Sequence, residues 1–204
     1  GTPGEVTDSA GSHDGTASAN VVTSSSSGKL GRHARFNGED DSFVSTGFVP
    51  TSDVKTVSAW VRFQAFNAAS DTVFGCKETG ANLYLGVSTL GYLMAGYGNN
   101  AIDGSSKYKI FSGVLTGRWY HIVMTQAEQE KVVYVYMNGN CVTKFNGEFS
   151  GSGQTEFLIG ALREGSSEGL MENVWIDEVV IDSVFWTDEM VRASYNRGSG
   201  RIVT

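Results

Sequence analysis

The feature that most constrains this chain is a pair of β-rich runs joined by an Asn-Gly dipeptide. Residues Val132–Met137 and Asn140–Phe145 are rich in β-branched and aromatic side chains, and Asn138-Gly139 stands between them. Both central residues of a type I′ turn need positive φ angles, which asparagine and glycine tolerate best. The segment therefore predicts a tight antiparallel hairpin, and a chain built around it needs further strands to complete a sheet.

Other short runs with strand character follow one another from residue 56 onward, each bounded by glycine, asparagine or serine. In the first of them, 56–63, alternate positions are apolar and are expected to share one face of a strand. These apolar positions are Val57, Ala59, Val61 and Phe63. The remaining expected strands are 72–76, 82–87, 92–97, 108–111, 118–125, 156–160 and 174–181.

One short helix is expected near the C-terminal end. Thr187 suits an N-cap, Asp188 and Glu189 suit the first turn, and the pattern ends near Gly198. Many short strands with so little helix predict two packed sheets or a barrel, in one domain over residues 1–204. No repeat with a period of about 20–50 residues is present, which disfavours a propeller or a solenoid.

Charge and composition argue against several classes of partner. The 204 residues include 15 basic and 22 acidic side chains, a net charge of −7. Such a surface repels phosphate backbones and anionic lipids, so neither nucleic acid nor a membrane is an expected partner. No run approaches the ~20 apolar residues that span a bilayer. The hydrophobic share of 40% is ample for a sizeable core.

The two cysteines, Cys76 and Cys141, do not form a Cys-x-x-Cys pair, which argues against structural zinc. We expect two small buried apolar side chains. A disulfide between them is the open alternative, because sequence alone does not give the distance between the two residues.

Several segments, in this order, resemble laminin G-like members of the concanavalin A-like lectin/glucanase superfamily. They are 6–16 with its Asp-Ser-x-Gly pattern, 31–44, Val57–Val61, Gly117–Val123, Tyr134–Gly139, Ile159-Gly160, Ile176–Val179 and Thr187–Met190. The resemblance covers essentially the whole chain. It implies an all-β, concanavalin A-like jelly-roll β-sandwich of two antiparallel sheets with one short C-terminal helix.

The start of the chain departs from the family pattern. Family members usually open with an apolar strand containing an aspartate, whereas Gly1 of this sequence already lies in the loop that follows such a strand. We expect the chain to be a fragment of a longer polypeptide, or another chain or segment to supply that strand. An unpaired sheet edge would then be exposed.

The motifs do not support hydrolytic chemistry. Laminarinase-type hydrolases of the superfamily carry Glu-x-Asp-x-(x)-Glu on one strand, and the nearest match, 39–44, lacks the closing glutamate. No Gly-x-Ser-x-Gly elbow and no phosphate-binding glycine loop is present. His121, which follows Trp119 in a strand, is expected to be a packed core residue, and His13 and His33 are expected in loops. We therefore expect no enzyme activity.

Calcium is the one ion that the resemblance supports. It implies that the Gly38 region lies beside the acidic strand, so that Asp177 supplies a carboxylate and Gly38 a carbonyl to Ca²⁺. The alternative is that Asp177 caps a turn or accepts backbone hydrogen bonds at the rim of the sheet.

Candidate ligand-binding residues are polar or aromatic and lie in loops or exposed turns, because sugars stack on aromatic rings while amides and carboxylates take their hydroxyl groups. They are Tyr97, Asn99, Asn100, Asp103 and Tyr108. The alternative is that Tyr97 and Tyr108 are ordinary strand-end residues. The four tryptophans, Trp60, Trp119, Trp175 and Trp186, are expected to pack in the core or at its rim rather than to form a glycan platform.

Two interpretations of function follow from different classes of protein. The first is a non-catalytic recognition or adhesion module that binds a glycan or glycoprotein. The second is a structural protein of a virion surface, such as a decoration, fibre or tail component, that binds other chains of a multi-chain assembly. A divergent glycoside hydrolase is the weakest alternative. All place the protein outside the cell or on the surface of a cell or particle.

Overall fold

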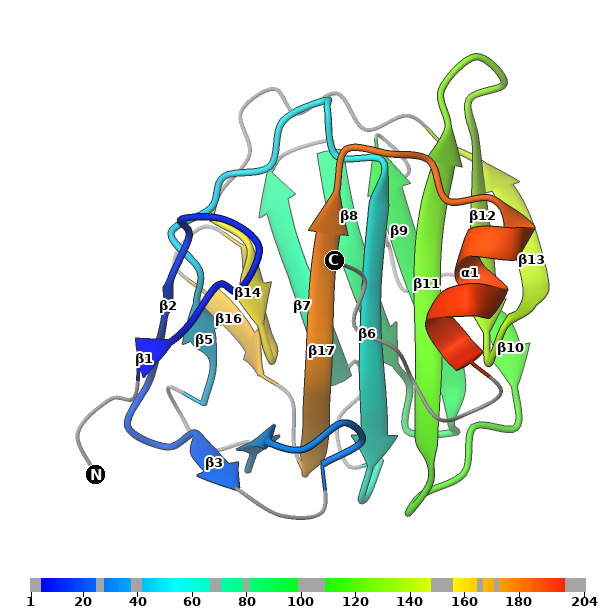
Figure 1. Ribbon diagram of the computed structural model, residues 1–204. Helices are drawn as coiled ribbons and strands as arrows, with labels where there is room; N and C mark the ends of the chain where they lie inside the picture. Colours follow the sequence, from blue (N-terminus) through cyan, green and yellow to red (C-terminus); the bar gives the residue numbers. More distant parts are fainter. Residues whose placement is uncertain are drawn as a thin grey trace.

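A computed structural model describes residues 5–24, 28–37, 42–66, 71–78, 81–98, 109–147, 156–164, 167–170 and 173–196. They form two antiparallel β-sheets stacked face to face, with one short helix against an outer face (Figure 1). We call the 7-stranded sheet, which is nearer the viewer in Figure 1, the front sheet, and the 8-stranded sheet the back sheet. The predicted all-β architecture of two antiparallel sheets is confirmed.

The order of strands in the front sheet is β13, β12, β11, β6, β17, β4, β3. In that order their bounds are Asn140–Asn146, Val132–Met137, Trp119–Ala127, Thr56–Phe63, Val174–Asp182, His33–Phe36 and Val22–Ser24. The back sheet has the order β1, β2, β5, β14, β7, β8, β9, β10. Its bounds are Glu5–Val6, Gly15–Ala17, Val44–Ser45, Leu158–Ile159, Asp71–Glu78, Ala81–Val87, Tyr92–Gly98 and Lys109–Ser112. A separate hairpin joins β15 (Ala161–Glu164) to β16 (Ser167–Leu170).

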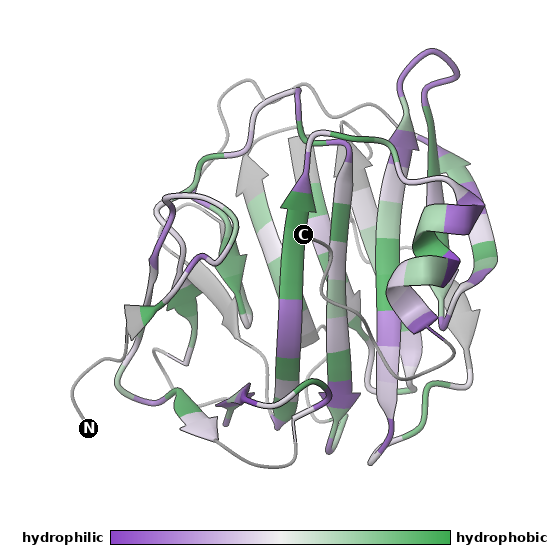
Figure 2. Cartoon of the chain, in the orientation of Figure 1, coloured by the Kyte–Doolittle hydropathy of each residue, from purple (hydrophilic) through white to green (hydrophobic). Residues whose placement is uncertain are grey.

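The core lies between the two sheets and is built by alternation along each strand. The predicted inward face of β6 is confirmed, since its four apolar residues Val57, Ala59, Val61 and Phe63 are fully buried. Aromatic and aliphatic side chains of the back sheet, such as Phe74 and Leu85, belong to the same buried cluster. Figure 2 shows the resulting change between hydrophobic and hydrophilic residues along β6 and β17. The polar and aromatic side chains between the core positions of β6 point to the outer face of the front sheet.

A β-bulge in β17 changes which residues of that strand face the core. Asp177 pairs with Trp60 and Val180 pairs with Ser58, so β17 has one residue more than β6 over this interval. Glu178, in the bulge, has a positive φ of 49°. Such a bulge shifts the alternation by one position. Ile176 before it and Val179 after it therefore both pack in the core.

The predicted hairpin joins β12 and β13. Asn138 and Gly139 both have positive φ, 51° and 78°, as a type I′ turn requires. A hydrogen bond of 3.0 Å from the His121 N–H to Asn138 Oδ1 fixes the turn against β11.

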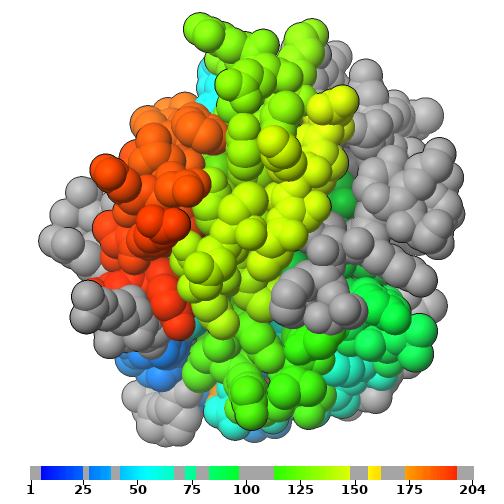
Figure 3. Space-filling model, turned by 90° about the vertical axis from the view of Figure 1, so that its right-hand side faces the viewer, coloured from blue at the N-terminus to red at the C-terminus, as the bar shows by residue number. Residues whose placement is uncertain are grey.

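The predicted helix is α1 (Asp188–Tyr195), and Thr187 is its N-cap, with Oγ1 accepting the Met190 N–H at 3.4 Å. It ends at Tyr195 rather than near Gly198, because Asn196 adopts a left-handed conformation with φ 43°. Val191 of the helix packs with Val123, Tyr136 and Trp186 in a second buried cluster. Figure 3 shows α1, in orange and red, lying beside the green and yellow strands β11 to β13.

The two cysteines differ in environment. Cys76 is buried in the main core, as expected. Cys141 is exposed on β13, so the expectation of two buried side chains is wrong for this residue. β13 is the outermost strand of the front sheet, where side chains are covered less than those of the central strands.

β1 is the outermost strand of the described back sheet and pairs with β2. The expected strand supplied from outside this chain stays a prediction. No helix in the described part of the chain is long and apolar enough to cross a membrane.

Candidate functional site

The outer face of the front sheet carries a row of aromatic and basic side chains at one end of the strands. Arg62 of β6 is paired with Trp119 of β11 on one side and with Trp175 of β17 on the other. Trp175 is paired in turn with Arg35 of β4. Directly paired residues of neighbouring strands point to the same face of a sheet. We call these four residues the aromatic–arginine row.

Contacts within the aromatic–arginine row are centred on Trp175. The guanidinium carbon Cζ of Arg62 lies 4.5 Å from the centroid of the Trp175 ring, and Cζ of Arg35 lies 5.7 Å from it. His33 stacks on Trp175 with a centroid distance of 4.6 Å and meets Trp119 edge-on at 6.1 Å. Cation–π and aromatic contacts of this kind are each worth roughly 0.5–2 kcal/mol. They hold the row in a defined arrangement.

The arginines of the aromatic–arginine row and the neighbouring His33 have few hydrogen-bond or ion-pair partners. Neither Arg35 nor Arg62 forms an ion pair with a carboxylate of the described residues. Arg62 Nε and both ring nitrogens of His33 are buried without a hydrogen-bond partner. Burial lowers the pKa of His33, and the nearby Asp177 carboxylate opposes this effect. His33 therefore stays neutral at physiological pH, and the two guanidinium groups carry the charge of the row.

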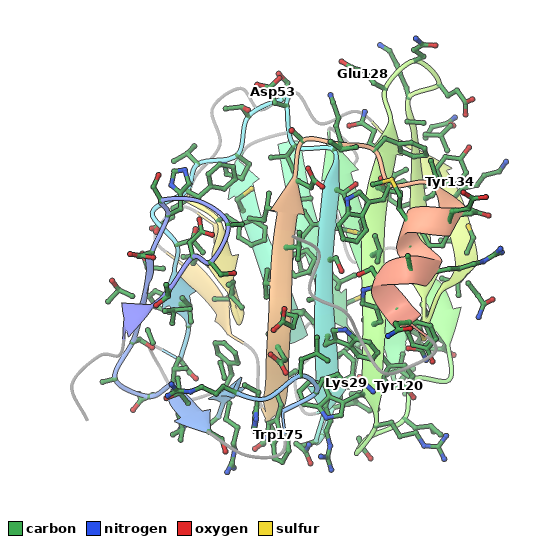
Figure 4. The ribbon with its side chains drawn as sticks, in the orientation of Figure 1. Lys29, Asp53, Tyr120, Glu128, Tyr134 and Trp175 are labelled. Atoms are coloured by element: carbon green, nitrogen blue, oxygen red, sulfur yellow. The ribbon has the colours of Figure 1, made fainter. Side chains whose placement is uncertain are left out.

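A second row lies beside the first, toward α1, and is more enclosed. Trp60 is 3% exposed; its ring is tilted against that of His121 and stacked on that of Tyr195, at centroid distances of 5.0 and 5.7 Å. Lys29 Nζ lies 4.5 Å above the Trp60 ring. Figure 4 shows Lys29 close to Trp175 at one end of the front sheet, whereas Asp53 and Glu128 lie at the opposite end.

His121 has the core role predicted from its position. It is 1% exposed, and its Nε2 lies 3.0 Å from Ser58 Oγ and 3.3 Å from Ser194 Oγ. Its Nδ1 has no hydrogen-bond partner. A Ser–His pair used for nucleophilic catalysis needs an exposed hydroxyl and a third group that orients the imidazole. Both are missing from the described surroundings of His121.

Asp177, the predicted calcium ligand, is 8% exposed and holds a loop. Its Oδ2 accepts the backbone N–H groups of Lys29 at 2.7 Å and Leu30 at 3.0 Å. This is the alternative role that the sequence left open. No group of three or more possible metal-binding side chains occurs among the described residues. Gly38 lies outside these residues, so the calcium site stays a prediction.

The predicted ligand-binding residues fall mostly outside the part of the chain that the structure describes. Tyr97 lies in β9, and its backbone is paired with Leu83 of β8. The other four, Asn99, Asn100, Asp103 and Tyr108, lie outside the described residues. Their role in binding stays a prediction.

The residues of the aromatic–arginine row were not identified from the sequence as a candidate binding site. Trp60 and Trp186 are buried, as expected, but Trp119 and Trp175 are half-buried on an outer face. His33 is in strand β4 and is 4% exposed, so its expected place in a loop is wrong. The alternation Trp60-Val61-Arg62 places Arg62 outward. That signal does not reveal which residues of other strands lie beside it.

The fold and this outer face define a lectin-like β-sandwich. The family model described as the concanavalin A-like lectin/glucanases superfamily matches residues 37–184. The chain therefore belongs to this laminin G-like family, and the resemblance seen in the sequence motifs is confirmed. No curated protein matches the chain in sequence.

Three solved structures are similar to the chain in fold. A sialidase of Trypanosoma rangeli, in complex with sialic acid, has a TM-score of 0.64 and 16% identity over 89% of this chain. The binding domain of botulinum neurotoxin DC, in complex with SialylT, has a TM-score of 0.64 and 14% identity over 90%. A putative carbohydrate-binding protein of Bacteroides ovatus has a TM-score of 0.58 and 19% identity over 86%.

The chain spans only part of each of these structures. The matched region makes up 29% of the sialidase chain and 46% of each of the other two. At such low sequence identities the similarity shows a shared fold.

Proposed function

We propose that the protein is a non-catalytic recognition module that binds carbohydrate. The observation that carries the proposal is the aromatic–arginine row on the outer face of a lectin-like sandwich. Sugars bind proteins by stacking their apolar faces on aromatic rings while polar groups take the hydroxyls and any acidic substituent. Half-buried Trp119 offers such a ring, and exposed Arg35 offers such a polar group.

The structural neighbours support this proposal. The botulinum neurotoxin domain was solved with SialylT, and the Bacteroides ovatus protein is described as a putative carbohydrate-binding protein. Fold alone does not fix function, so the support comes from the fold together with the side chains of the row. Recognition of glycans or glycoproteins outside the cell, or on the surface of a particle, is part of the same proposal.

The absence of catalysis is proposed on the residues of β5 and of the His121 region. Glu39-Asp40-Asp41 resembles the start of the Glu-x-Asp-x-(x)-Glu motif of laminarinase-type hydrolases. Phe43 and Val44 stand where that motif has its closing glutamate. Val44 is buried in the core at 2% exposure, and Phe43 is half-buried. Glycosidases need two carboxylates on either side of the scissile bond. The closing acid is replaced by a core residue.

A glycan array followed by titration calorimetry tests the proposal. We expect reproducible binding to a limited set of glycans with micromolar or tighter affinity, and no release of reducing sugar from those that bind. Measured turnover of a bound polysaccharide would contradict the non-catalytic assignment. Binding to no glycan, together with stable copurification with a multi-chain particle, would instead favour the structural role.

A further inference from the structure

The aromatic–arginine row contains two positively charged side chains, Arg35 and Arg62. Resting on the carbohydrate-binding function proposed above, we propose that this row binds an anionic saccharide. Arg35 and Arg62 would take the carboxylate or sulfate group of the sugar, and Trp119 would stack against its ring.

The two arginines flank Trp175 and bring two positive charges to the outer face. They come from β4 and β6, the strands on either side of β17, and both guanidinium groups lie over the ring of Trp175. Neither is neutralised by a described carboxylate. Each guanidinium group carries a positive charge that a neighbouring anion would neutralise. Guanidinium groups match the oxygens of carboxylates and sulfates in geometry, and such charge-assisted hydrogen bonds are strong.

Buried groups without partners mark the same place. His33 is 4% exposed, and neither of its ring nitrogens has a partner; the same is true of Arg62 Nε. Native proteins leave few buried polar groups unsatisfied, and each instance calls for an explanation such as a ligand or a water molecule. His33 contacts both tryptophans of the row. The unsatisfied groups therefore lie at the centre of the proposed site.

Trp119 is the ring that is left for a sugar. Trp175 is occupied by two guanidinium groups and by His33. Over Trp119, by contrast, no described cation lies, and its closest described ring neighbours are His33, edge-on, and Trp175, at 6.4 Å. A sugar stacked on Trp119 would have its acidic substituent next to Arg62, which is paired with Trp119 across the strands.

The local charge contrasts with that of the whole protein. The net charge of −7 repels anions in general. At this end of the front sheet, however, exposed Arg32 and Arg118 flank β4 and β11, and Lys29 lies above Trp60. The Asp177 carboxylate acts electrostatically on His33, and two backbone N–H groups already donate to its Oδ2. The basic end is thus a local site in an acidic protein.

The test compares three matched sugars with two arginine variants. Sialyllactose carries a carboxylate, sulfated lactose carries a sulfate ester, and lactose carries neither. We expect the wild-type chain to bind at least one of the two acidic sugars more tightly than lactose. Arg35→Gln and Arg62→Gln should each weaken that binding about 10- to 100-fold, the loss of one charge-assisted hydrogen-bonded contact, with little effect on lactose. The acidic sugar that binds more tightly then identifies the anionic group as a carboxylate or a sulfate.

Control variants separate the site from general charge effects and from misfolding. Arg192→Gln removes the same charge from α1, where the side chain is exposed, and should leave binding unchanged. Arg35 is exposed and its cation–π contact with Trp175 is the longer of the two, so its variant should stay folded and lower the thermal midpoint by no more than a few degrees. Trp119→Leu should weaken binding of the acidic sugar and remove the change in tryptophan fluorescence that this sugar causes.

The outcomes distinguish this inference from the proposed function. If lactose or other neutral glycans bind as well as the acidic sugars, or if acidic sugars bind equally to both arginine variants, the inference is overturned while carbohydrate binding stands. If no glycan binds to the wild-type chain, the proposed function fails, and the inference fails with it.

Discussion

The carboxylate of Asp177 in β17 accepts the backbone N–H of Lys29 at 2.7 Å, which joins two segments that are far apart in the sequence. The same Oδ2 atom accepts the N–H of Leu30 at 3.0 Å. These bonds hold the segment before β4 over the outer face of the front sheet, where Lys29 Nζ also lies above Trp60. One buried acid thereby positions a loop beside the candidate site.

We expect Asp177→Ala to lower the free energy of unfolding by about 2–3 kcal/mol, because two N–H groups lose a charged acceptor. Asp177→Asn should cost less, since its amide oxygen still accepts. Urea unfolding followed by fluorescence measures both. Asp53→Ala is the control, because Asp53 is exposed and its loss should change stability by no more than about 0.5 kcal/mol.

The predicted calcium site at Asp177 and Gly38 is tested by the same variants. A ligand at 100 times its dissociation constant stabilises a fold by about 2.7 kcal/mol. If Ca²⁺ binds there, EGTA lowers the thermal midpoint of the wild-type chain and has no effect on Asp177→Ala. A wild-type midpoint that EGTA does not change would leave Asp177 with its hydrogen-bonding role alone.

Stability should depend on pH through His121. Burial lowers its folded pKa from 6.5 to about 4. Between these values the unfolded chain binds a proton that the folded chain does not, so the free energy of unfolding falls as the pH is lowered. The full effect is roughly 3 kcal/mol and is complete near pH 4. Between pH 7 and pH 4 the free energy of unfolding of the wild type should fall by this amount relative to that of His121→Gln. Parallel pH dependences would show that folding does not lower the pKa of His121.

Gly160 should tolerate no side chain. It has a φ of 83°, and an added Cβ would clash with the ring of Phe36 in the core. We expect Gly160→Ala to cost about 2–5 kcal/mol from backbone strain and overpacking together. Gly117 has a similar φ of 77° and open space around it. Gly117→Ala should therefore cost only the backbone part, about 1–2 kcal/mol. Equal losses in the two variants would contradict the contact with Phe36.

The two thiols should react in sequence. Cys141 is exposed and Cys76 is buried, so a thiol reagent should modify one equivalent in the native protein and the second only on unfolding. Partial burial and the charge of Asp188 raise the pKa of Cys141, which should make its reaction slower than that of a free thiol. Cys141→Ser should abolish the native reaction. Two equivalents reacting at once would show that the core around Cys76 opens.

Local patterns were sufficient for most strands after residue 56, for the hairpin and for the helix cap, but they did not predict β1 to β5 or the β15–β16 hairpin. Asn138-Gly139 specifies its turn because the φ angles belong to those two residues. Thr187 caps α1 for the same local reason. The β17 bulge was not predicted, because the successive residues Val179, Val180 and Ile181 are all apolar and do not show which of them faces the core. Pairing with β6 decides where the extra residue is placed.

By itself the sequence determined that this chain forms many short strands with one capped helix, because alternation and turn chemistry act over a few neighbouring residues. The resemblance of its motifs to laminin G-like proteins implied the β-sandwich. Only the tertiary structure decided that Arg62, Trp119, Trp175 and Arg35 share one row. These residues come from four strands whose order and register follow from packing the two sheets together. A difference of one residue in register would turn a side chain to the other face. The candidate site is therefore a product of strand pairing and is carried by no single motif.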